Sequence, residues 1–373
     1  MKRYTFLDLA TVNQRYMPRI EEALLRVARS GRYVGGEEVE AFERELAAMM
    51  GVEHAIGVSN GLDALRLIFR AYIEMGVMRP GDEVIVPSNT YIASVLAVTD
   101  NGLTPVFAEP DMATMNLDAE CVERCITDRT VVVMPVHLYG RVCMSDALAD
   151  VVARHSLMVV EDNAQAIGAS QEGVMTGALG NAAAFSFYPT KNVGALGDAG
   201  AVTTDDAELA AAVRALRNYG TDRQYHNVYA GLNCRLDPVQ AAILRAKLPD
   251  MDFENAYRRE IASIYDASIC NPAVQKPAMP AEPGQHVWHQ YVVMTCQRDS
   301  FRDYLMEHGV ETAIHYPTAM HRQPCYENRF GHLHLPVAER IAREVVSLPV
   351  TRCTSPSDAR EIADIINGWR PPY

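Results

Sequence analysis

The sequence lacks the paired cysteines of a zinc site or of a disulfide framework. Its eight cysteines are scattered, and none forms a CxxC pair. Cys121 and Cys125 lie one helical turn apart, but no second pair of cysteine or histidine residues accompanies them at a matching spacing. This pattern argues against a bound metal and favours reduced thiols, which are typical of a cytosolic protein.

Long hydrophobic runs are also missing. No apolar run approaches the roughly 18 residues that a membrane-spanning helix requires. The N-terminal segment, MKRYTFLDLATVNQRYMPRIEEALLRVA, lacks the apolar core and the cleavage site of a secretory leader. We therefore expect a cytoplasmic protein that does not bind a membrane.

Positive charge is in short supply, since the formal net charge is -13. Such a surface repels polyanions, so nucleic acid is not an expected partner, whereas a small anionic substrate needs a local cluster of donors. The hydrophobic content of 49% and the charged content of 22% are those of an ordinary globular protein. With 373 residues, the chain is long enough for two domains.

Apolar segments alternate with helix-length segments through the first part of the chain. Runs that are apolar throughout, with such connections between them, predict a mostly parallel sheet that is buried on both faces. The first predicted strand ends at Val58. Six further strands are predicted over 82–87, 104–110, 130–137, 156–162, 182–188 and 199–205. Helices are predicted over 12–30, 36–50 and 62–75. The fold class is therefore α/β.

The pattern changes after the last of these strands. A helical stretch over 237–268 starts at a favourable proline, Pro238, and Pro249 is expected to bend or break it. A proline-rich linker, a strand, a helix and a further strand are predicted over 271–284, 286–295, 298–309 and 310–317. We predict a large α/β domain over 1–249 and a smaller α+β domain over 250–373.

One lysine, Lys191, stands in an unusual context, FSFYPTKNVGALGDAGAV. Aromatic residues precede it and glycines follow it, whereas a solvated surface lysine needs none of these neighbours. Glycine allows close backbone approach, and an amine in a desolvated site loses its proton more easily. Such an amine is a nucleophile for a carbonyl group, although a lysine that reaches the surface is the simpler interpretation of this residue alone.

Three further features follow predicted strands, where open α/β sheets bind ligands. In VSNGLDAL, a glycine turn that enters a helix exposes backbone N–H groups, which suit an anion but also occur in ordinary turns. Asp162 ends an apolar strand next to Glu161, and it can pair with a protonated ring nitrogen or simply cap a helix. Tyr91 can stack on a flat ring or pack in the core.

Taken together, these features indicate one cofactor. An anion cradle, an ionised aspartate, a flat aromatic side chain and a nucleophilic lysine are the groups that pyridoxal 5'-phosphate requires. The cradle would hold the phosphate, Asp162 would keep the pyridine nitrogen protonated, and Lys191 would form a Schiff base with the aldehyde. This interpretation explains why Lys191 lies among small and apolar residues.

Over nearly the whole chain, the sequence resembles the nucleotide-sugar aminotransferases of the DegT type, within the fold type I pyridoxal phosphate enzymes. The resemblance rests on GRYVGGEEVEAFERELA, GVSNGLDAL, GDEVIVPSNTYIAS, PVHLYG, EDNAQAIGA, FSFYPTKNVGALGDAGAV, LRNYG, GLNCRLDPVQAAIL and HYP. It implies a large domain with a mostly parallel, seven-stranded mixed sheet and a smaller C-terminal α+β domain.

Carried over residue by residue, the resemblance makes Lys191 and Asp162 the catalytic residues. The other implied cofactor contacts are Gln165 at the phenolic oxygen, Tyr91 on the ring face, and, at the phosphate, Gly61, Leu62, Ser186 and Asn233. Asn233 is expected to reach the phosphate of the neighbouring subunit, so that a homodimer shares its two active sites. Leu62 stands where many relatives have threonine, so one hydroxyl contact to the phosphate is lost. The phosphate contacts of Ser186 and Asn233 should therefore matter more.

The implied reaction is a ping-pong transamination from L-glutamate to a nucleotide-linked keto-sugar, with Lys191 as general acid and base. NGLDAL, SNTYIAS and GALGDAG look most like the branch that acts on dTDP-3-keto-6-deoxyhexoses, so a 3-amino sugar is the expected product. Candidate substrate contacts are Tyr188 and His315 at the sugar and Arg32 and Tyr33 at the pyrophosphate; packing is the alternative role for each.

Other functions remain open at this point. Within the family, the substrate could be a 4-keto sugar. A sugar dehydratase of the same fold would replace the lysine with a non-nucleophile, so Lys191 argues against it. A non-catalytic regulator would need a surface that recognises its partner, and the chain has no basic arm and no helix-turn-helix segment. An NAD-binding Rossmann protein would carry GxGxxG, which GVSNGLDAL lacks.

Overall fold

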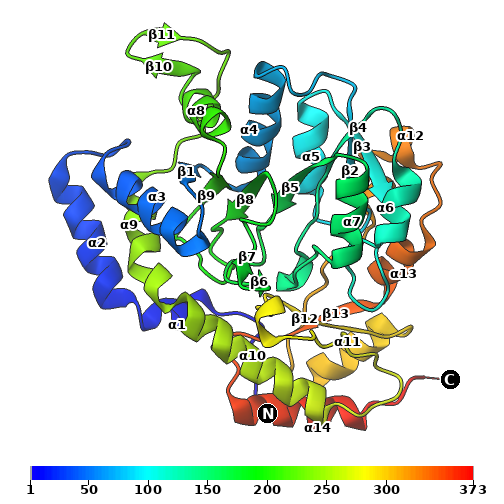
Figure 1. Ribbon diagram of the computed structural model, residues 1–373. Coiled ribbons are helices and arrows are strands. Elements are labelled where there is room, and N and C mark those ends of the chain that lie inside the picture. The colour runs from blue at the N-terminus through cyan, green and yellow to red at the C-terminus, as the bar shows by residue number, and fades with distance from the viewer. Residues whose placement is uncertain (1, 373) are drawn as a thin grey trace.

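A mixed sheet of seven strands forms the centre of the computed structural model, which describes residues 2–372 (Figure 1). β9 is antiparallel to both of its neighbours, and the remaining pairs are parallel. The predicted α/β class and mostly parallel sheet are thereby confirmed. Across the sheet the strands lie in the order β1 (His54–Val58), β9 (Gly200–Thr204), β8 (Ala182–Ser186), β5 (Met158–Asp162), β4 (Thr130–Val133), β2 (Glu83–Pro87) and β3 (Thr104–Ala108).

The strand register brings the ends of several strands to one edge of the sheet. Val58 at the end of β1 pairs with Gly200 at the start of β9, and Gly200 also pairs with Ser186 at the end of β8. Asp162 at the end of β5 pairs with Ala184 on β8. Because parallel strands point the same way, their ends and the loops that follow them gather at this edge, and several predicted site residues, among them Asp162, Ser186 and Lys191, lie there.

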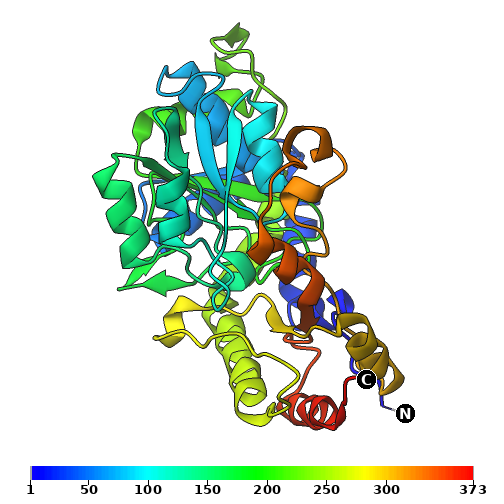
Figure 2. The same ribbon diagram turned by 90° about the vertical axis from the view of Figure 1, so that its right-hand side faces the viewer.

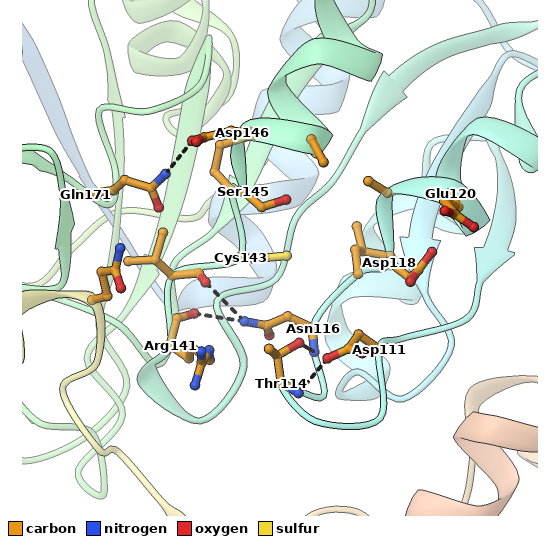
Figure 3. A pocket seen from close by; sticks show the side chains of 16 residues that line it. Asp111, Thr114, Asn116, Asp118, Glu120, Arg141, Cys143, Ser145, Asp146 and Gln171 are labelled. Carbon is orange, nitrogen blue, oxygen red and sulfur yellow. Dashed lines mark hydrogen bonds between the residues drawn. The ribbon is translucent and has the colours of Figure 1, made fainter. Parts of the chain in front are cut away.

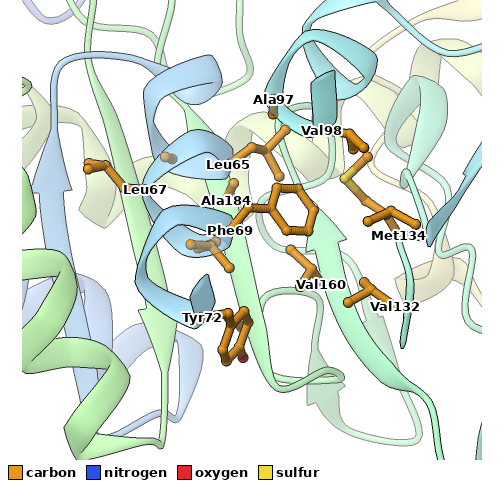
Figure 4. Packing of buried hydrophobic residues seen from close by; sticks show 14 of the residues in the cluster. Leu65, Leu67, Phe69, Tyr72, Ala97, Val98, Val132, Met134, Val160 and Ala184 are labelled. Carbon is orange, nitrogen blue, oxygen red and sulfur yellow. The ribbon is translucent and has the colours of Figure 1, made fainter. Parts of the chain in front are cut away.

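Helices cover both faces of the sheet, and strand side chains alternate between the two layers. On β8, Ala184 packs with one layer and Phe185 with the other. The first layer contains α4 (Gly61–Glu74), α5 (Ile92–Asp100) and α8 (Ala207–Leu216); Figure 4 shows Leu65 and Phe69 of α4 facing Val160 of β5. The second contains α3 (Glu37–Met50), α6 (Ala119–Cys125), α7 (Asp146–Arg154) and α9 (Pro238–Lys247).

A second core lies at the end of the molecule that holds the C-terminal elements (Figure 2). There β12 (Tyr291–Met294) pairs antiparallel with β13 (Val345–Leu348). The surrounding helices are α10 (Met251–Ser268), α11 (Arg298–Glu307) and α14 (Pro356–Gly368). Tyr4 belongs to this core, whereas Phe330, in α12 (Glu327–Phe330), packs with the first. The proposed division between 249 and 250 falls within the short 3-10 helix η2 (Leu248–Asp250).

The expected break at Pro249 is confirmed, because η2 separates α9 from α10. The strand expected over 310–317 is wrong. This segment makes only isolated bridges, Val310 to Tyr4 and Ala313 to Ser347, and the fully buried β13 takes the place beside β12. The helix expected over 12–30 is two helices, α1 (Leu9–Gln14) and α2 (Met17–Ser30). Pro18 has no N–H and cannot continue the hydrogen bonds of α1, but it is well tolerated in the first turn of α2.

Several short elements have no counterpart in the sequence-based assignment. They are the hairpins β6 (Ser170–Gln171) with β7 (Val174–Met175) and β10 (Thr221–Arg223) with β11 (His226–Asn227), the helix α13 (Pro336–Glu344), and the 3-10 turns η1 (Leu138–Gly140), η3 (Pro283–Gln285) and η4 (Met320–Arg322). Strands of two or three residues and single turns are too short to produce a readable hydrophobic period, whereas α13, with nine residues, lies beyond 317, where no element is predicted from the sequence. Among residues 2–372, no helix has the length and apolar character needed to cross a bilayer.

Candidate active site

A cavity of about 480 Å³ lies at the edge of the sheet where the strand ends gather, a size typical of small-molecule sites. The predicted residues that line it are Gly61, Leu62, Tyr91, Asp162, Gln165, Ser186, Tyr188, Lys191 and His315. Arg32, Tyr33 and Asn233 do not line it and are exposed at the surface of this chain. The sequence-based site is thus brought together except for these three residues.

The N-terminus of α4 forms the anion cradle. Asn60 caps the helix by accepting the Asp63 N–H at 2.8 Å, which leaves the N–H groups of Gly61 and Leu62 without a protein partner among the described residues. A Cβ on Gly61 would lie 2.8 Å from the Cβ of Ser186, so only glycine lets this helix end approach the serine. Two free N–H groups, a hydroxyl and a positive helix end suit a phosphate.

The loop that carries Lys191 is a tight turn built on glycine. The Lys191 N–H donates to the Tyr188 carbonyl at 2.8 Å. A Cβ on Gly194 would lie 2.4 Å from the carbonyl oxygen of Pro189, so a larger residue would push the turn open. Lys247, which is buried, donates to the Gly194 carbonyl at 2.5 Å and so holds this loop in place. The glycine-rich sequence therefore serves to close the turn around the lysine.

Asp162 is 6% exposed and faces the cavity from the end of β5. The Ser94 hydroxyl donates to its Oδ2 at 2.7 Å, and the Ala164 N–H donates to its Oδ1 at 3.1 Å. The alternative role as a helix cap is excluded, because residues 163–169 form turns and no helix begins there. A carboxylate fixed by two donors on the wall of a cavity fits a cationic ring nitrogen.

The neighbouring carboxylate, Glu161, points away from the cavity and is structural. It accepts hydrogen bonds from the N–H groups of Gly177, Leu179 and Gly180, each at 2.8 Å. Its Oε2 also lies 2.8 Å from Nε2 of His137. These contacts hold the end of β5 in place, and so they hold Asp162 in place.

A network that sequence reasoning missed surrounds Gln165. Its Oε1 accepts the Tyr139 N–H at 2.6 Å, and its Nε2 donates to the Tyr316 hydroxyl at 3.1 Å. The Tyr316 ring lies 5.2 Å from the ring of Tyr91. Tyr316 is the middle residue of the HYP segment quoted above, so a signal was present. In the apolar wall of the cavity, Leu65, Ile92 and Val136 also belong to quoted segments, whereas Leu96 does not.

The cavity is poor in positive charge. Burial lowers the pKa of Lys191 to about 8, although the nearby Asp162 acts in the opposite direction. Burial and the charge of Lys191 lower the pKa of His315 to about 4, so this imidazole is neutral at neutral pH. Lys191 is then the one cationic side chain among the described residues that line the cavity. A doubly anionic substrate needs further cations from outside this chain's own cavity.

The lowered pKa predicts how cofactor-free protein captures pyridoxal phosphate. The neutral amine is the nucleophile, so the reactive fraction of Lys191 rises with pH until the pH exceeds about 8. We expect the rate constant of capture, followed by visible absorbance, to rise about tenfold per pH unit below that value and to level off above it. A rate that still climbs at about pH 10 would contradict the lowered pKa, because an ordinary lysine behaves in that way.

A second cavity, of about 510 Å³, shares no lining residue with the first (Figure 3). Three of its four carboxylates are already engaged, since Asp111 accepts the Thr114 N–H at 2.7 Å, Asp118 accepts the Cys121 N–H at 2.8 Å and Asp146 accepts from Gln171 at 3.3 Å. No lysine occurs among the described residues that line it. The two cavities are similar in size, so the chemistry of the lining residues identifies the first as the candidate active site.

Comparison with known proteins assigns the chain to a family. Residues 15–367 match the DegT/DnrJ/EryC1/StrS aminotransferase family. The chain belongs to this family. It is 48% identical over 364 residues, 98% of this chain and 99% of the relative, to the dTDP-3-amino-3,6-dideoxy-alpha-D-galactopyranose transaminase of Aneurinibacillus thermoaerophilus.

A second relative, the dTDP-3-amino-3,4,6-trideoxy-alpha-D-glucose transaminase of Streptomyces venezuelae, is 44% identical over 369 residues, 98% of this chain and 96% of the relative. The crystal structure of S. venezuelae DesV in complex with a ketimine intermediate has a TM-score of 0.94 and 43% identity, and the match covers 99% of both chains. The chain is therefore a pyridoxal phosphate-dependent aminotransferase of fold type I, which confirms the cofactor and the fold inferred from the sequence.

Proposed function

We propose that this enzyme transfers the amino group of L-glutamate to C3 of a dTDP-linked 3-keto-6-deoxyhexose and releases the 3-amino sugar. The observation that carries the proposal is the 48% identity over 98% of the chain to a transaminase named for a dTDP-3-amino-3,6-dideoxy sugar. The relative at 44% identity is likewise named for a dTDP-3-amino sugar. A chain without a membrane-crossing helix among its described residues is compatible with the predicted cytoplasmic location.

The residues of the cavity fit pyridoxal phosphate. When bound, the cofactor supplies an electron-accepting ring and carries the amino group between donor and ketone. Gly61, Leu62 and Ser186 would hold its phosphate, and Asp162, fixed by Ser94, would keep its ring nitrogen protonated. Lys191 would hold the cofactor between reactions and, once its amine is free, move a proton to or from the sugar carbon that receives nitrogen.

The geometry of the site favours one ketone position. The tight turn fixes Lys191, and the strand ends fix Asp162 and the cradle, so the sugar must adapt its position to them. A 3-keto and a 4-keto sugar present their carbonyls at different distances from the pyrophosphate, and one pose cannot bring both to the amine. Tyr188 and the neutral His315 line the cavity and would set that pose.

The reaction with single substrates tests this preference. Enzyme loaded with pyridoxamine phosphate is mixed with dTDP-3-keto-6-deoxyglucose or with its 4-keto isomer, and the return of visible absorbance is followed. We expect the 3-keto sugar to react at least about 100-fold faster, because a misplaced carbonyl costs about that factor. A faster reaction with the 4-keto sugar would reject the C3 assignment and leave the aminotransferase activity unaffected.

We further propose a homodimer in which each cavity is completed by the other subunit. Lys191 is the one cation among the described cavity residues, while a nucleotide diphosphate and glutamate both bring negative charge. Arg32, Tyr33 and Asn233 lie outside the cavity of their own chain and are exposed. In a neighbour's cavity they would supply the missing donors, with Asn233 at the phosphate and Arg32 at the pyrophosphate.

A subunit-mixing experiment tests the shared site. Asn233→Ala alone is expected to weaken pyridoxal phosphate retention by about 1–3 kcal/mol, the value of a hydrogen bond to a charged group. Mixing it with inactive Lys191→Ala subunits creates hybrid dimers in which one cavity has both residues. At limiting cofactor, activity should therefore exceed that of either variant alone. No gain on mixing, or a fully active monomer at high dilution, would disprove the shared site.

A further inference from the structure

His289 lines the cavity, and neither the sequence pattern nor the proposed function gives it a role. Its side chain is 5% exposed, and the cavity that it lines also contains Lys191 and Asp162. Nδ1 of His289 lies 3.1 Å from Oδ1 of Asn192, the residue that follows Lys191. The imidazole is therefore attached to the loop that carries the lysine.

Two amide side chains determine which ring nitrogen carries the proton. Asn255 on α10 donates through Nδ2 to the Ile167 carbonyl at 3.0 Å, so its Oδ1 is the atom that accepts from Nδ2 of Asn192 at 2.9 Å. The same Nδ2 of Asn192 also donates to the Val287 carbonyl at 3.1 Å. Oδ1 of Asn192 can then only accept, so His289 must donate to it through Nδ1 and keep a lone pair on Nε2.

Burial and charge keep this imidazole neutral. Burial holds the pKa of His289 well below its usual range, and the cations Lys191 and Arg258 act in the same direction. Arg258 is buried on α10 and donates to the backbone carbonyl of His289 at 3.3 Å. The other titratable side chains around the cavity are Tyr91, Asp162, Tyr188, Asp198, His315 and Tyr316. A neutral ring that donates through Nδ1 is an acceptor at Nε2.

The free nitrogen opens on the cavity. Nε2 of His289 has no hydrogen-bond partner within the described part of the chain, yet it is not one of the polar atoms sealed away from solvent. Among residues 2–372, the only group that raises the pKa of the Lys191 amine is Asp162, which acts by charge and forms no hydrogen bond to the amine. The cavity thus contains an unused acceptor and an amine without a hydrogen-bond acceptor.

We propose that His289 is a positioning residue whose Nε2 accepts a hydrogen bond from the Lys191 amine whenever that amine is free, and thereby aims the lysine and stabilises its charged form. The chain of amides from Asn255 through Asn192 holds the Nδ1 edge of the ring on the loop that carries the lysine and leaves Nε2 free to accept. The inference rests on the proposed role of Lys191 in moving the proton. The proposed hydrogen bond gives the lysine a defined orientation during the part of the cycle in which the lysine is not bonded to the cofactor.

Two variants separate the roles of the ring nitrogens. In His289→Asn, the side-chain amide can replace Nδ1 as the donor to Asn192, and nothing replaces Nε2. In His289→Gln, the longer side chain can carry an acceptor to the position of Nε2. The sequence contains only four lysines, Lys2, Lys191, Lys247 and Lys276, so labelling with [ε-13C]lysine gives four NMR signals. The Lys191→Ala variant identifies the signal of Lys191 by its loss.

The measurement uses full-length enzyme loaded with pyridoxamine phosphate, in which the Lys191 amine is free. We expect the pKa of Lys191 to fall by about one pH unit in His289→Asn, because the ammonium loses its acceptor, and to stay within about 0.3 unit of wild type in His289→Gln. The pH profile of kcat should move in the same direction. Lys247 donates to Asn13 and to Gly194, so its titration should be unchanged and serves as the control for folding.

An unchanged Lys191 pKa in His289→Asn overturns the proposal. An equal fall in both variants also overturns it, since that result points to lost packing and not to a lost acceptor. Failure of the underlying role of Lys191 gives a different signature. In that case Lys191→Ala protein would keep turnover close to that of wild type, which the lysine titration does not measure.

Discussion

Replacing Lys191 with alanine should abolish both turnover and the visible absorbance of the purified enzyme. The lysine lines the cavity on a closed turn, and burial brings its pKa to about 8, so its amine is available as a nucleophile and as a base. Without it, nothing forms the covalent bond to the cofactor and nothing moves the proton. We expect kcat to fall by at least about 1,000-fold.

The small number of lysines makes this prediction easy to control. Lys276→Ala changes a lysine that pairs with Asp266 and does not line the cavity, so colour and turnover should persist. Borohydride reduction of the wild-type enzyme should fix the cofactor on a single peptide, the one that contains Lys191. Turnover of Lys191→Ala within about tenfold of wild type would rule out the assigned role, because a lost general base costs more.

The second large effect is expected at Asp162. In Asp162→Asn, the amide can keep contacts with the Ala164 N–H and the Ser94 hydroxyl, so the geometry is retained and the negative charge is lost. The ring nitrogen then no longer has an anion to keep it protonated, and the electron-accepting capacity of the ring falls. Removing one electrostatic group of this kind costs about 100- to 1,000-fold in kcat, measured at saturating pyridoxal phosphate.

Ser94→Ala is the matched comparison for Asp162→Asn. It removes the 2.7 Å hydrogen bond that fixes the carboxylate and leaves the charge in place. We expect a loss of about tenfold, because one orienting hydrogen bond is lost while the charge and the contact with the Ala164 N–H remain. Equal losses in the two variants would show that Asp162 acts through its position alone and would contradict the role of its charge.

Much of the large domain could be predicted from the sequence because its strands are apolar on both faces. In the run that forms β8, Ala184 packs with one helical layer and Phe185 with the other. Such a run can be recognised as a strand without knowing which strands pair with it. Lys191, Asp162 and the turn at Gly61 were found because each follows such a strand. Strand ends in a parallel sheet converge on one edge, so their positions in sequence predicted their proximity in space.

The strand pairing of the C-terminal elements, and the residues that they bring to the cavity, could not be predicted in the same way. β13 is a four-residue strand, and the expected strand over 310–317 failed because neighbours along the sequence do not determine which segment pairs with β12. His289 and Tyr316 reach the cavity only because the second core packs beside the sheet edge. Contacts that depend on packing between distant segments leave no periodic trace in the sequence.

The position of the new amine tests the central claim most directly. Wild-type enzyme is given glutamate and an equal mixture of the dTDP-linked 3-keto- and 4-keto-6-deoxyhexoses, and the product is examined by NMR. We predict that nitrogen is found at C3, because Lys191 and the cradle fix the reacting carbon relative to the pyrophosphate. An amine found only at C4 would contradict the proposed function, and recovery of both ketones without any amino sugar would contradict the sugar aminotransferase activity itself.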